Sequence, residues 1–439
     1  MRILDIKGLL REGGFIPKAK KKLFGWNIVL VCFLLMAVTF PPMYTLIGQT
    51  VAPMTEEFEV SRTVSGLVII AGFVGVTIGS PLAGRVHNRH KTKHVVAIAL
   101  VGISACCVSV FFSQRIELVI LLSAARGFVF SFVGIVAVSV MINSWFGSNA
   151  RGKAQALTMM GSGAGGIIIS PILARIIVEY GWRYSYLLFA SLNLVVLPLV
   201  LLFFVSPPTD NTEGISVESR ADSKATIVES LPGLSGEQAL RSRMFWFSAC
   251  CFVLMGGANQ TWNINAAPFY EDLGVGRAYI GSIVAISSFT MMIGKLILGM
   301  VCDRLGAKCS AAICIGCAII GYGLATLGAS AQLTVLVVPC AMLLGFWLSM
   351  STTVMPIIAA ELYGSKEYGV CLGYCQMGDA LGASIIPVFT TLFYDATGNY
   401  ALSFGFSAIS GAVMMVMLYI AYKLRKGEYA RFGLTPESL

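Results

Sequence analysis

Long apolar stretches dominate this chain, and each is about as long as a helix that crosses a membrane. A lipid bilayer is spanned by roughly 20 mostly apolar residues in α-helical form. Of the 439 residues, 56% are hydrophobic and only 12% are charged, about half the charged fraction of an average soluble domain. The alternating strands typical of membrane barrels are missing from the sequence. We therefore predict an all-α membrane protein.

Twelve stretches are predicted to be transmembrane helices. Their approximate bounds are 26–48, 63–83, 94–112, 117–142, 154–178, 184–205, 244–268, 277–299, 309–328, 333–359, 368–393 and 400–423. The predicted organisation is a basic tail (1–24), a first six-helix bundle (25–205), a polar linker (206–243), a second six-helix bundle (244–424) and a tail (425–439). The basic first tail lacks the features of a cleavable signal peptide.

A ten-residue pattern occurs once in each predicted bundle. Residues 84–93 read GRVHNRHKTK and residues 299–308 read GMVCDRLGAK, and both follow G-x-V-x-(N/D)-R-x-x-x-K. Other landmarks recur at a similar spacing, such as Gly166 and Gly382. The sequence therefore predicts two pseudo-symmetric halves. Repeated halves that rock around a central binding site are typical of secondary transporters.

Basic residues are distributed unevenly over the predicted loops. With the N-terminus in the cytoplasm, 24 Lys and Arg residues fall on the cytoplasmic side and 5 on the other. The remaining two, Arg126 and Lys295, lie inside predicted helices. Because cytoplasmic loops carry an excess of basic residues, we expect both termini in the cytoplasm. The formal net charge of +9 follows from this distribution, and its spread over short loops argues against nucleic-acid binding.

Several motifs resemble those of the major facilitator superfamily. The pattern at 84–93 resembles that superfamily's motif between helices two and three, and 299–308 resembles its echo between helices eight and nine. Three further motifs resemble a branch of monocarboxylate transporters and oxalate/formate antiporters. They are Gly25-Trp26 opening helix one, Trp145-Phe146 with Arg151 to Ala154 before helix five, and Glu237 to Trp246 before helix seven. The resemblance implies alternating access, with two six-helix halves.

The repeated pattern is interpreted as a gating motif of Gly84, Asn88, Arg89, Gly299, Asp303, Arg304 and Lys308. The acidic or amide residue and the Arg are expected to pair across the turn and with neighbouring helix ends, and to separate on rocking. The first copy departs from the family pattern, with Asn88 in place of Asp and Lys91 in place of Gly. The alternative interpretation is that this loop only binds anionic membrane lipid.

Two charges inside predicted helices suggest the site, because an isolated charge in hydrocarbon is costly. Lys295 lies about 12 Å along the helix from Asp303. The resemblance implies that a basic residue here binds the substrate carboxylate. The family usually has Arg, and Lys lacks its bidentate fork. The alternative is a lysine whose ammonium reaches back to the lipid headgroups.

Asp379 is the second charge, in predicted helix eleven. Oxalate/formate members tend to have a lysine near here, where this chain has Met377, so a second cation is missing and a monoanion or a larger acid is favoured. If Asp379 pairs with Lys295 in the empty site, a proton or a substrate carboxylate competes for that pair. Asp379 is therefore the candidate for proton coupling, with a purely structural carboxylate as the alternative.

Further substrate-binding candidates come from helices that line the cavity in this superfamily, and from the neighbourhood of Asp379. They are Arg126, Tyr44, Asn259, Trp262, Asn263, Trp347 and Gln376. For Arg126 the alternative is a structural bond to helix one, and for the tryptophans it is packing. The two tryptophans are consistent with a roomy site for an apolar or aromatic acid.

The sequence favours a carrier of a small organic anion in a bacterial inner membrane, with a co-transported proton or an exchanged counter-anion as partner. No nucleotide-binding motif, paired CxxC motif or nucleophile–base set occurs, so we expect no cofactor, no metal and no enzymatic activity. His87, His90 and His94 share one loop, but a solvated basic surface is the simpler reading. A multidrug-type exporter and a non-transporting membrane sensor are the rival hypotheses.

Overall fold

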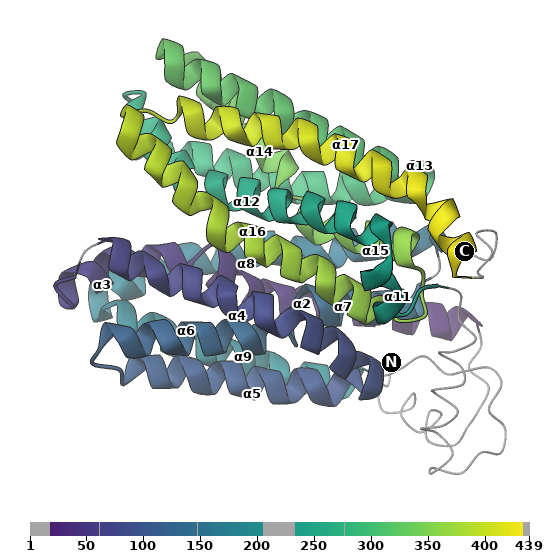
Figure 1. Ribbon diagram of the computed structural model, residues 1–439. Helices are drawn as coiled ribbons and strands as arrows, with labels where there is room; N and C mark the ends of the chain where they lie inside the picture. Colours follow the sequence, from purple (N-terminus) through teal and green to yellow (C-terminus); the bar gives the residue numbers. More distant parts are fainter. Residues whose placement is uncertain (1–17, 61, 147, 205–232, 276, 433–439) are drawn as a thin grey trace.

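The computed structural model describes residues 18–60, 62–146, 148–204, 233–275 and 277–432, and these residues are almost entirely helical. Most of the predicted linker (206–243) and parts of both predicted tails lie outside the described residues. The helices run side by side in two layers, one formed by each half of the chain (Figure 1). Because membrane helices satisfy their backbone hydrogen bonds internally, this architecture suits a bilayer.

The first half of the chain contains eight α-helices and one short 3₁₀ helix in its described residues. They are α2 (Lys18–Tyr44), η1 (Ile47–Thr50), α3 (Val51–Glu57), α4 (Arg62–Arg89), α5 (Thr92–Phe111), α6 (Ile116–Phe130), α7 (Ile135–Trp145), α8 (Ser148–Tyr180) and α9 (Trp182–Phe203). The predicted helix 117–142 is therefore interrupted, since a turn at 131–134 separates α6 from α7.

The described residues of the second half form a similar series of long helices joined by short segments. They form α11 (Gly236–Arg241), α12 (Arg243–Asp272), α13 (Arg277–Ala331), η2 (Thr334–Leu336), α14 (Val337–Trp347), η3 (Met350–Val354), α15 (Met355–Tyr363), α16 (Tyr368–Thr397) and α17 (Ala401–Arg431). The predicted helix 333–359 is interrupted by η3, a π-helical segment, and such segments are frequent at functional sites.

Ten helical stretches within the described residues are long and apolar enough to cross a membrane. One of them, Ser282–Ala331, has 50 residues and would be about 75 Å long as a single helix, more than twice the hydrocarbon thickness. The chain turns inside this stretch at Gly306, whose φ of 83° is readily adopted only by glycine. α12 is not among the ten, although it has 30 residues, and its span carries a cluster of amide side chains.

Each half packs around its own hydrophobic core. The first core includes Leu35 and Phe189, and the second includes Tyr322 and Phe404. Within the first half, Gly161 and Gly165 of α8 lie directly against the backbone of α2, where a Cβ atom would overlap carbonyl oxygens. These glycines therefore allow α8 and α2 to pack closely.

The two halves contact each other mainly through two helix pairs, α4 with α16 and α8 with α13, and less extensively through α7 with α16 and α8 with η3. Glycines of the repeated pattern lie at both places where the helices of the two main pairs cross each other. Gly84 of α4 faces the backbone of Gly369, and Gly299 of α13 faces Gly152 and Ala156 of α8. The pattern was expected in a loop, but α4 runs through its first six residues to Arg89, because these residues continue the helix that packs on α16.

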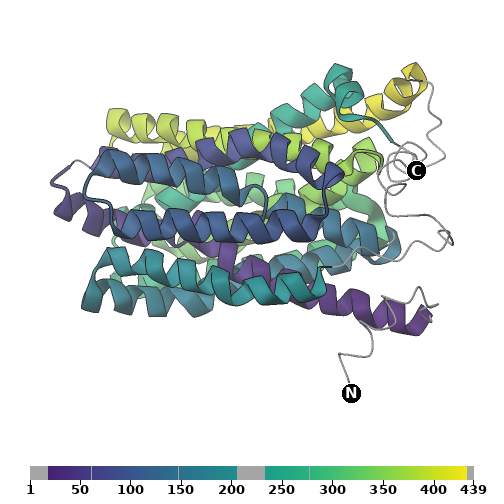
Figure 2. The same ribbon diagram turned by 90° about the horizontal axis from the view of Figure 1, so that it is seen from below.

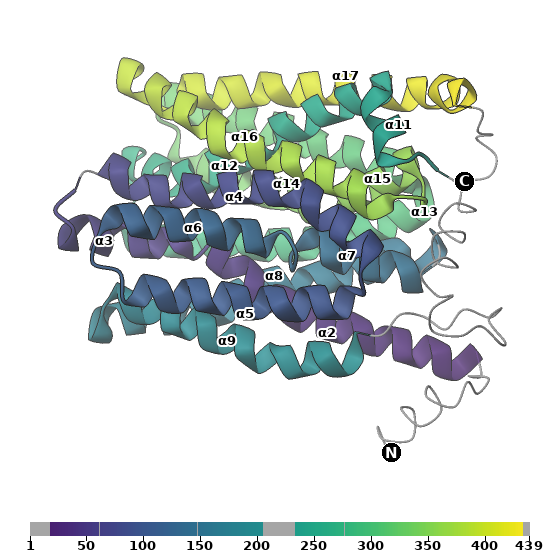
Figure 3. The ribbon, with the colours of Figure 1, turned by 60° about the horizontal axis from the view of Figure 1, so that its bottom comes forward.

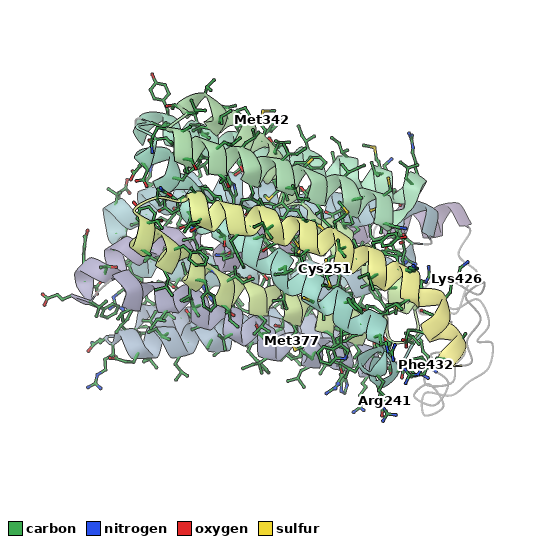
Figure 4. All side chains as sticks on the ribbon, turned by 45° about the horizontal axis from the view of Figure 1, so that its top comes forward. Arg241, Cys251, Met342, Met377, Lys426 and Phe432 are labelled. Carbon is green, nitrogen blue, oxygen red and sulfur yellow. The ribbon has the colours of Figure 1, made fainter. Side chains whose placement is uncertain are left out.

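The two crossings lie toward one end of the bundle, which carries both copies of the pattern and is called the motif end below. The start of α2 and the end of α17 also lie at this end (Figures 1 and 2). Arg241, Lys426 and Phe432 are gathered there as well (Figure 4).

We expect Gly299→Ala to destabilise the protein, whereas Gly316→Ala in the same helix should not. A Cβ at Gly299 would lie 2.6 Å from the Gly152 carbonyl oxygen, while a Cβ at Gly316 meets nothing within 4 Å. Overpacking of this kind costs about 1–3 kcal/mol. Thermal unfolding of both detergent-purified variants checks this, and equal melting temperatures would contradict the assigned crossing.

Candidate functional site

A small cavity lies between the two halves, beside η3 and the middle of α12 and α16. Its volume of about 50 Å³ has room for a few water molecules or a small ligand. Both halves contribute to its lining, which consists of Phe40, Tyr44, Thr45, Gly256, Asn259, Gln260, Asn263, Met291, Lys295, Leu348, Ser351, Thr352, Asp379 and Ala383. The cavity combines apolar side chains with a few convergent polar groups, as ligand sites do.

Lys295 is fully buried and reaches from α13 to the first half. Its Nζ donates to the Ser162 hydroxyl at 2.5 Å and to the Met159 carbonyl at 3.1 Å, both on α8. Nζ also lies 5.9 Å from the centre of the Phe40 ring. The ammonium is therefore directed across the interface between the halves and into the cavity, away from the lipid headgroups.

Asp379 lines the same cavity from α16 and belongs to a hydrogen-bonded chain. The Gln376 amide donates to Asp379 Oδ2 and to the Tyr44 hydroxyl, at 3.3 Å in each case. Tyr44 is on α2, so this chain also joins the two halves. In the described part of the protein no ion pair connects Lys295 with Asp379, and Asp379 Oδ1 has no hydrogen-bond partner.

The amide cluster of α12 supplies the remaining polar lining. Asn259, Gln260 and Asn263 all face the cavity. Asn259 is buried, and its Oδ1 finds no partner among the described residues. A buried unpaired amide oxygen in a membrane helix is costly, so this group is available to a ligand donor or to water.

Both tryptophans that were predicted to line the site lie outside the cavity lining. Trp262 packs its ring against Tyr270, Tyr322 and Phe404. Trp347 is fully buried in the hydrophobic core of the second half. The packing alternative therefore describes both, because each side chain points into its own half.

Arg126 is also remote from this cavity. It lies in a separate small space beside Pro42 of α2, Cys107 of α5 and Asn193 of α9, and its guanidinium is 5.4 Å from the centre of the Tyr186 ring. All of these neighbours belong to the first half. The structural alternative predicted a bond from Arg126 to helix one. Arg126 does lie next to α2, but its Nε and Nη1 have no hydrogen-bond partner among the described residues, so that bond stays a prediction.

The second copy of the repeated pattern connects the halves through Asp303. Its two carboxylate oxygens accept hydrogen bonds from the backbone amides of Gly152 at 2.7 Å and Lys153 at 2.9 Å, near the start of α8. A carboxylate is favoured there by the helix dipole. Arg304 and Lys308 are exposed, and Lys308 lies over the Tyr419 ring.

The first copy occupies the equivalent place at α16 but lacks the charge. Asn88 lies beside Gly369 near the start of α16, and Arg85 donates to the Tyr374 hydroxyl at 2.9 Å. Arg89 is exposed. The backbone of the turn also differs at the eighth residue of the two copies. Lys91 is extended with a φ of −68°, whereas the equivalent Gly306 has a positive φ. The two crossings are therefore similar in geometry and unequal in electrostatics.

Sequence reasoning missed several residues of the cavity. Phe40 and Met291 resemble any other lipid-facing or core residue in the sequence. Ser162 does not line the cavity but accepts a hydrogen bond from Lys295, and it was not among the predicted site residues. The one available signal was a hydroxyl between two glycines, in Gly161-Ser162-Gly163. Only the approach of α8 to α13 gives Ser162 its contact with Lys295.

The described residues contain no group of three or more His, Cys, Asp and Glu side chains that could hold a metal ion. His87 is buried, and its Nε2 lies 3.1 Å from the Phe132 carbonyl oxygen, while His90 and His94 are exposed. The three histidines therefore do not converge.

Comparison with known proteins agrees with this architecture. The Major Facilitator Superfamily model matches residues 28–269 and 248–437. Monocarboxylate transporter 12-B of Danio rerio is 24% identical over 444 residues, covering 93% of this chain and 90% of that protein. Monocarboxylate transporter 12 of Homo sapiens is 22% identical and covers 92% of this chain and 82% of that protein.

The solved structure of the proton:xylose symporter XylE bound to 6-bromo-6-deoxy-D-glucose has a similar fold. Its TM-score is 0.73 at 16% identity, with 95% of this chain and 98% of that chain covered. The chain belongs to the major facilitator superfamily, as predicted, and is distantly related to monocarboxylate transporters. It is a multi-pass membrane protein and a secondary transporter, not an enzyme.

We expect Asp303→Asn to weaken the contact between the motif end of α13 and the start of α8. The loss of charge at a helix start costs about 0.5–2 kcal/mol, so the contact should open roughly 2- to 30-fold more often. Hydrogen–deuterium exchange of the amides around Gly152 measures this. Asp272→Asn is the matched control, because Asp272 contacts Tyr394 within its own half, and unchanged exchange in Asp303→Asn would refute the contact's role.

Proposed function

We propose that this protein carries a small organic monoanion across the membrane by alternating access, coupled to a proton or to exchange with another anion. The proposed topology has twelve crossings in two halves, 25–205 and 244–424, with a cytoplasmic linker and both termini in the cytoplasm. α12 supplies one crossing, and the two arms of α13 around Gly306 supply two. A bacterial inner membrane is the proposed location.

The observation that carries the proposal is the environment of Lys295. Its ammonium is fully buried between the halves, yet its hydrogen-bond acceptors, the Ser162 hydroxyl and the Met159 carbonyl, are both neutral. A buried charge without a counter-ion is costly, and one partner of opposite sign offsets most of that cost. A substrate carboxylate in the adjoining cavity would supply that partner.

The remaining lining supports a small organic monoanion. Lys295 is the one basic side chain that lines the cavity, since Arg126 lies elsewhere. Met377 provides no second cation, and Asp379 would oppose a second carboxylate. Phe40, Met291 and Leu348 offer apolar contact to a short carbon chain. The distant relatives named monocarboxylate transporters add support for this substrate class.

The bonds across the interface suggest how binding would drive the conformational change. Lys295 to Ser162 and Gln376 to Tyr44 both join the halves at the cavity, and a substrate that competes for these groups alters the balance of the two states. We propose Asp303, Asn88 and their pattern neighbours as gating residues, because their contacts must separate when the motif end opens.

Two rival functions can be distinguished from a carrier. An aromatic-rich site would favour a multidrug-type exporter, but Trp262 and Trp347 lie outside the cavity lining, which is small and contains Lys295 and Asp379. A membrane sensor that binds without transport would have the same cavity. Counterflow in liposomes separates it from a carrier, because only a carrier exchanges labelled ligand across the bilayer.

Lys295→Gln should lower counterflow of the preferred acid in proteoliposomes by roughly 10- to 100-fold, since a hydrogen bond to a charged group contributes about 1.5–3 kcal/mol. A panel of labelled short monocarboxylates, dicarboxylates and a cationic dye identifies that acid first. Lys295→Arg keeps the charge and should retain more activity than the glutamine variant.

Lys423→Gln is the matched control, because Lys423 is exposed on α17 and remote from the cavity. Unchanged acid counterflow in correctly folded Lys295→Gln would remove Lys295 as the anion anchor. Transport of the dye with no transport of any acid by the parent would support the exporter instead.

Asp379→Asn tests the proposed proton coupling. A permanently neutral side chain cannot exchange a proton, so uptake should lose its stimulation by an inward proton gradient, while acid-for-acid counterflow continues. Asp272→Asn should leave the stimulation intact. If the Asp379→Asn variant still responds fully to the gradient, the proton is carried by another group. If the parent itself shows no stimulation, the protein is an anion exchanger.

A further inference from the structure

A second, larger hollow lies outside the transport cavity, on the first half of the protein. Its volume is about 830 Å³, and it runs between the end of α4, the first half of α5 and the turn between α6 and α7. It is lined by Val86, Arg89, His90, Lys91, His94, Val95, Ile98, Ala99, Gly102, Val129 and Phe132. None of these residues lines the cavity around Lys295, so the groove is a separate feature.

The groove exists because the fourth apolar segment is interrupted. α6 ends at Phe130 and α7 begins at Ile135, so the turn between them departs from α5. The buried His87 ring lies 3.1 Å from the Phe132 carbonyl oxygen, which the interruption releases from helical bonding. At the floor, Gly102 has no side chain, and a Cβ there would lie 3.1 Å from Val129.

The rim of the groove at the motif end is basic. Arg89, His90, Lys91 and His94 are all exposed there, and among the residues that the structure describes no acidic side chain lines the groove. Lys91 is also the residue before α5, and its side chain makes no cap hydrogen bond, so the first backbone amides of α5 add partial positive charge. This end of the groove suits an anionic group.

The rest of the groove is apolar and faces the surroundings of the bundle. From His94 to Gly102 it extends about 12 Å along α5, with Val95, Ile98 and Val129 along its walls. Ile98 is 73% exposed, and Val101 beside it is 49% exposed. α5 lies at the outer edge of the first half (Figure 3), so these side chains meet lipid in a membrane.

We propose that this groove binds one anionic phospholipid, with the phosphate at Arg89, Lys91 and His94 and an acyl chain along Ile98 and Val129. The charge and the apolar length are complementary to such a lipid, because basic residues at a membrane surface attract anionic headgroups and the groove continues into the hydrocarbon. The bound lipid would contact Arg89, which belongs to the first copy of the repeated pattern and is a proposed gating residue.

Native mass spectrometry of the delipidated full-length protein tests the proposal. Dioleoyl phosphatidylglycerol is titrated against dioleoyl phosphatidylcholine, which has the same chains and no net charge. The parent should retain one phosphatidylglycerol in preference to phosphatidylcholine. Lys91→Gln with His94→Gln should weaken retention by about fivefold or more, since each basic residue near an anionic membrane surface contributes about that factor.

Lys93→Gln is the matched control, because Lys93 lies in the first turn of α5 close to Lys91 in the sequence but does not line the groove. It should bind phosphatidylglycerol as the parent does. Gly102→Leu fills the floor and should also lower retention while leaving the basic rim unchanged. Both rim substitutions are at exposed positions, so folding is preserved and a null result remains informative.

Three results would overturn the proposal. If the parent retains the two lipids equally, the protein does not recognise the charge of the headgroup. If Lys93→Gln lowers phosphatidylglycerol retention as much as Lys91→Gln/His94→Gln does, the groove is not the binding site. If glycerol phosphate competes for the site as effectively as the whole lipid does, the site binds only the anionic headgroup and not the acyl chain.

Discussion

The main physical constraint on this structure is the free-energy cost of burying the Lys295 ammonium group between the two halves. The Lys295 side chain is fully buried, and its hydrogen bonds go to neutral oxygens of α8. The approach of α13 to α8 brings those oxygens within reach, and glycines such as Gly299 and Gly152 permit that approach. The group that we propose as the anion anchor is thus also a contact between the halves.

The two crossings between halves show how a repeated sequence can become functionally unequal. At one crossing a carboxylate, Asp303, holds two backbone amides of α8. At the other, Asn88 occupies the same place beside α16 without a charge, and the residues that follow it, from Arg89 to Lys91, are basic and exposed. The groove that we propose as a lipid site lies beside this uncharged contact.

Most of the fold was predictable because hydrophobic length and charge asymmetry are local properties. The apolar segments, their grouping and the superfamily followed from the sequence. The prediction was less accurate where a helix is interrupted at 131–134 and at Met350–Val354. The break at 131–134 lies in a mostly apolar run without proline, so hydropathy carries no signal for it. The break at Met350–Val354 lies in a Ser- and Thr-containing stretch shortly before Pro356 of α15, which lacks a backbone N–H, and the prediction did not use this signal.

The candidate site was only partly predictable for a related reason. The sequence by itself determined which side chains are too polar to face lipid, such as Lys295, Asp379 and Asn259, because that cost belongs to the residue. It did not determine which of the buried residues share one cavity. Trp262 and Arg126 turn into their own half, while Ser162 and Phe40 meet Lys295. That choice depends on how helices far apart in the chain are rotated against each other, and only tertiary packing decides it.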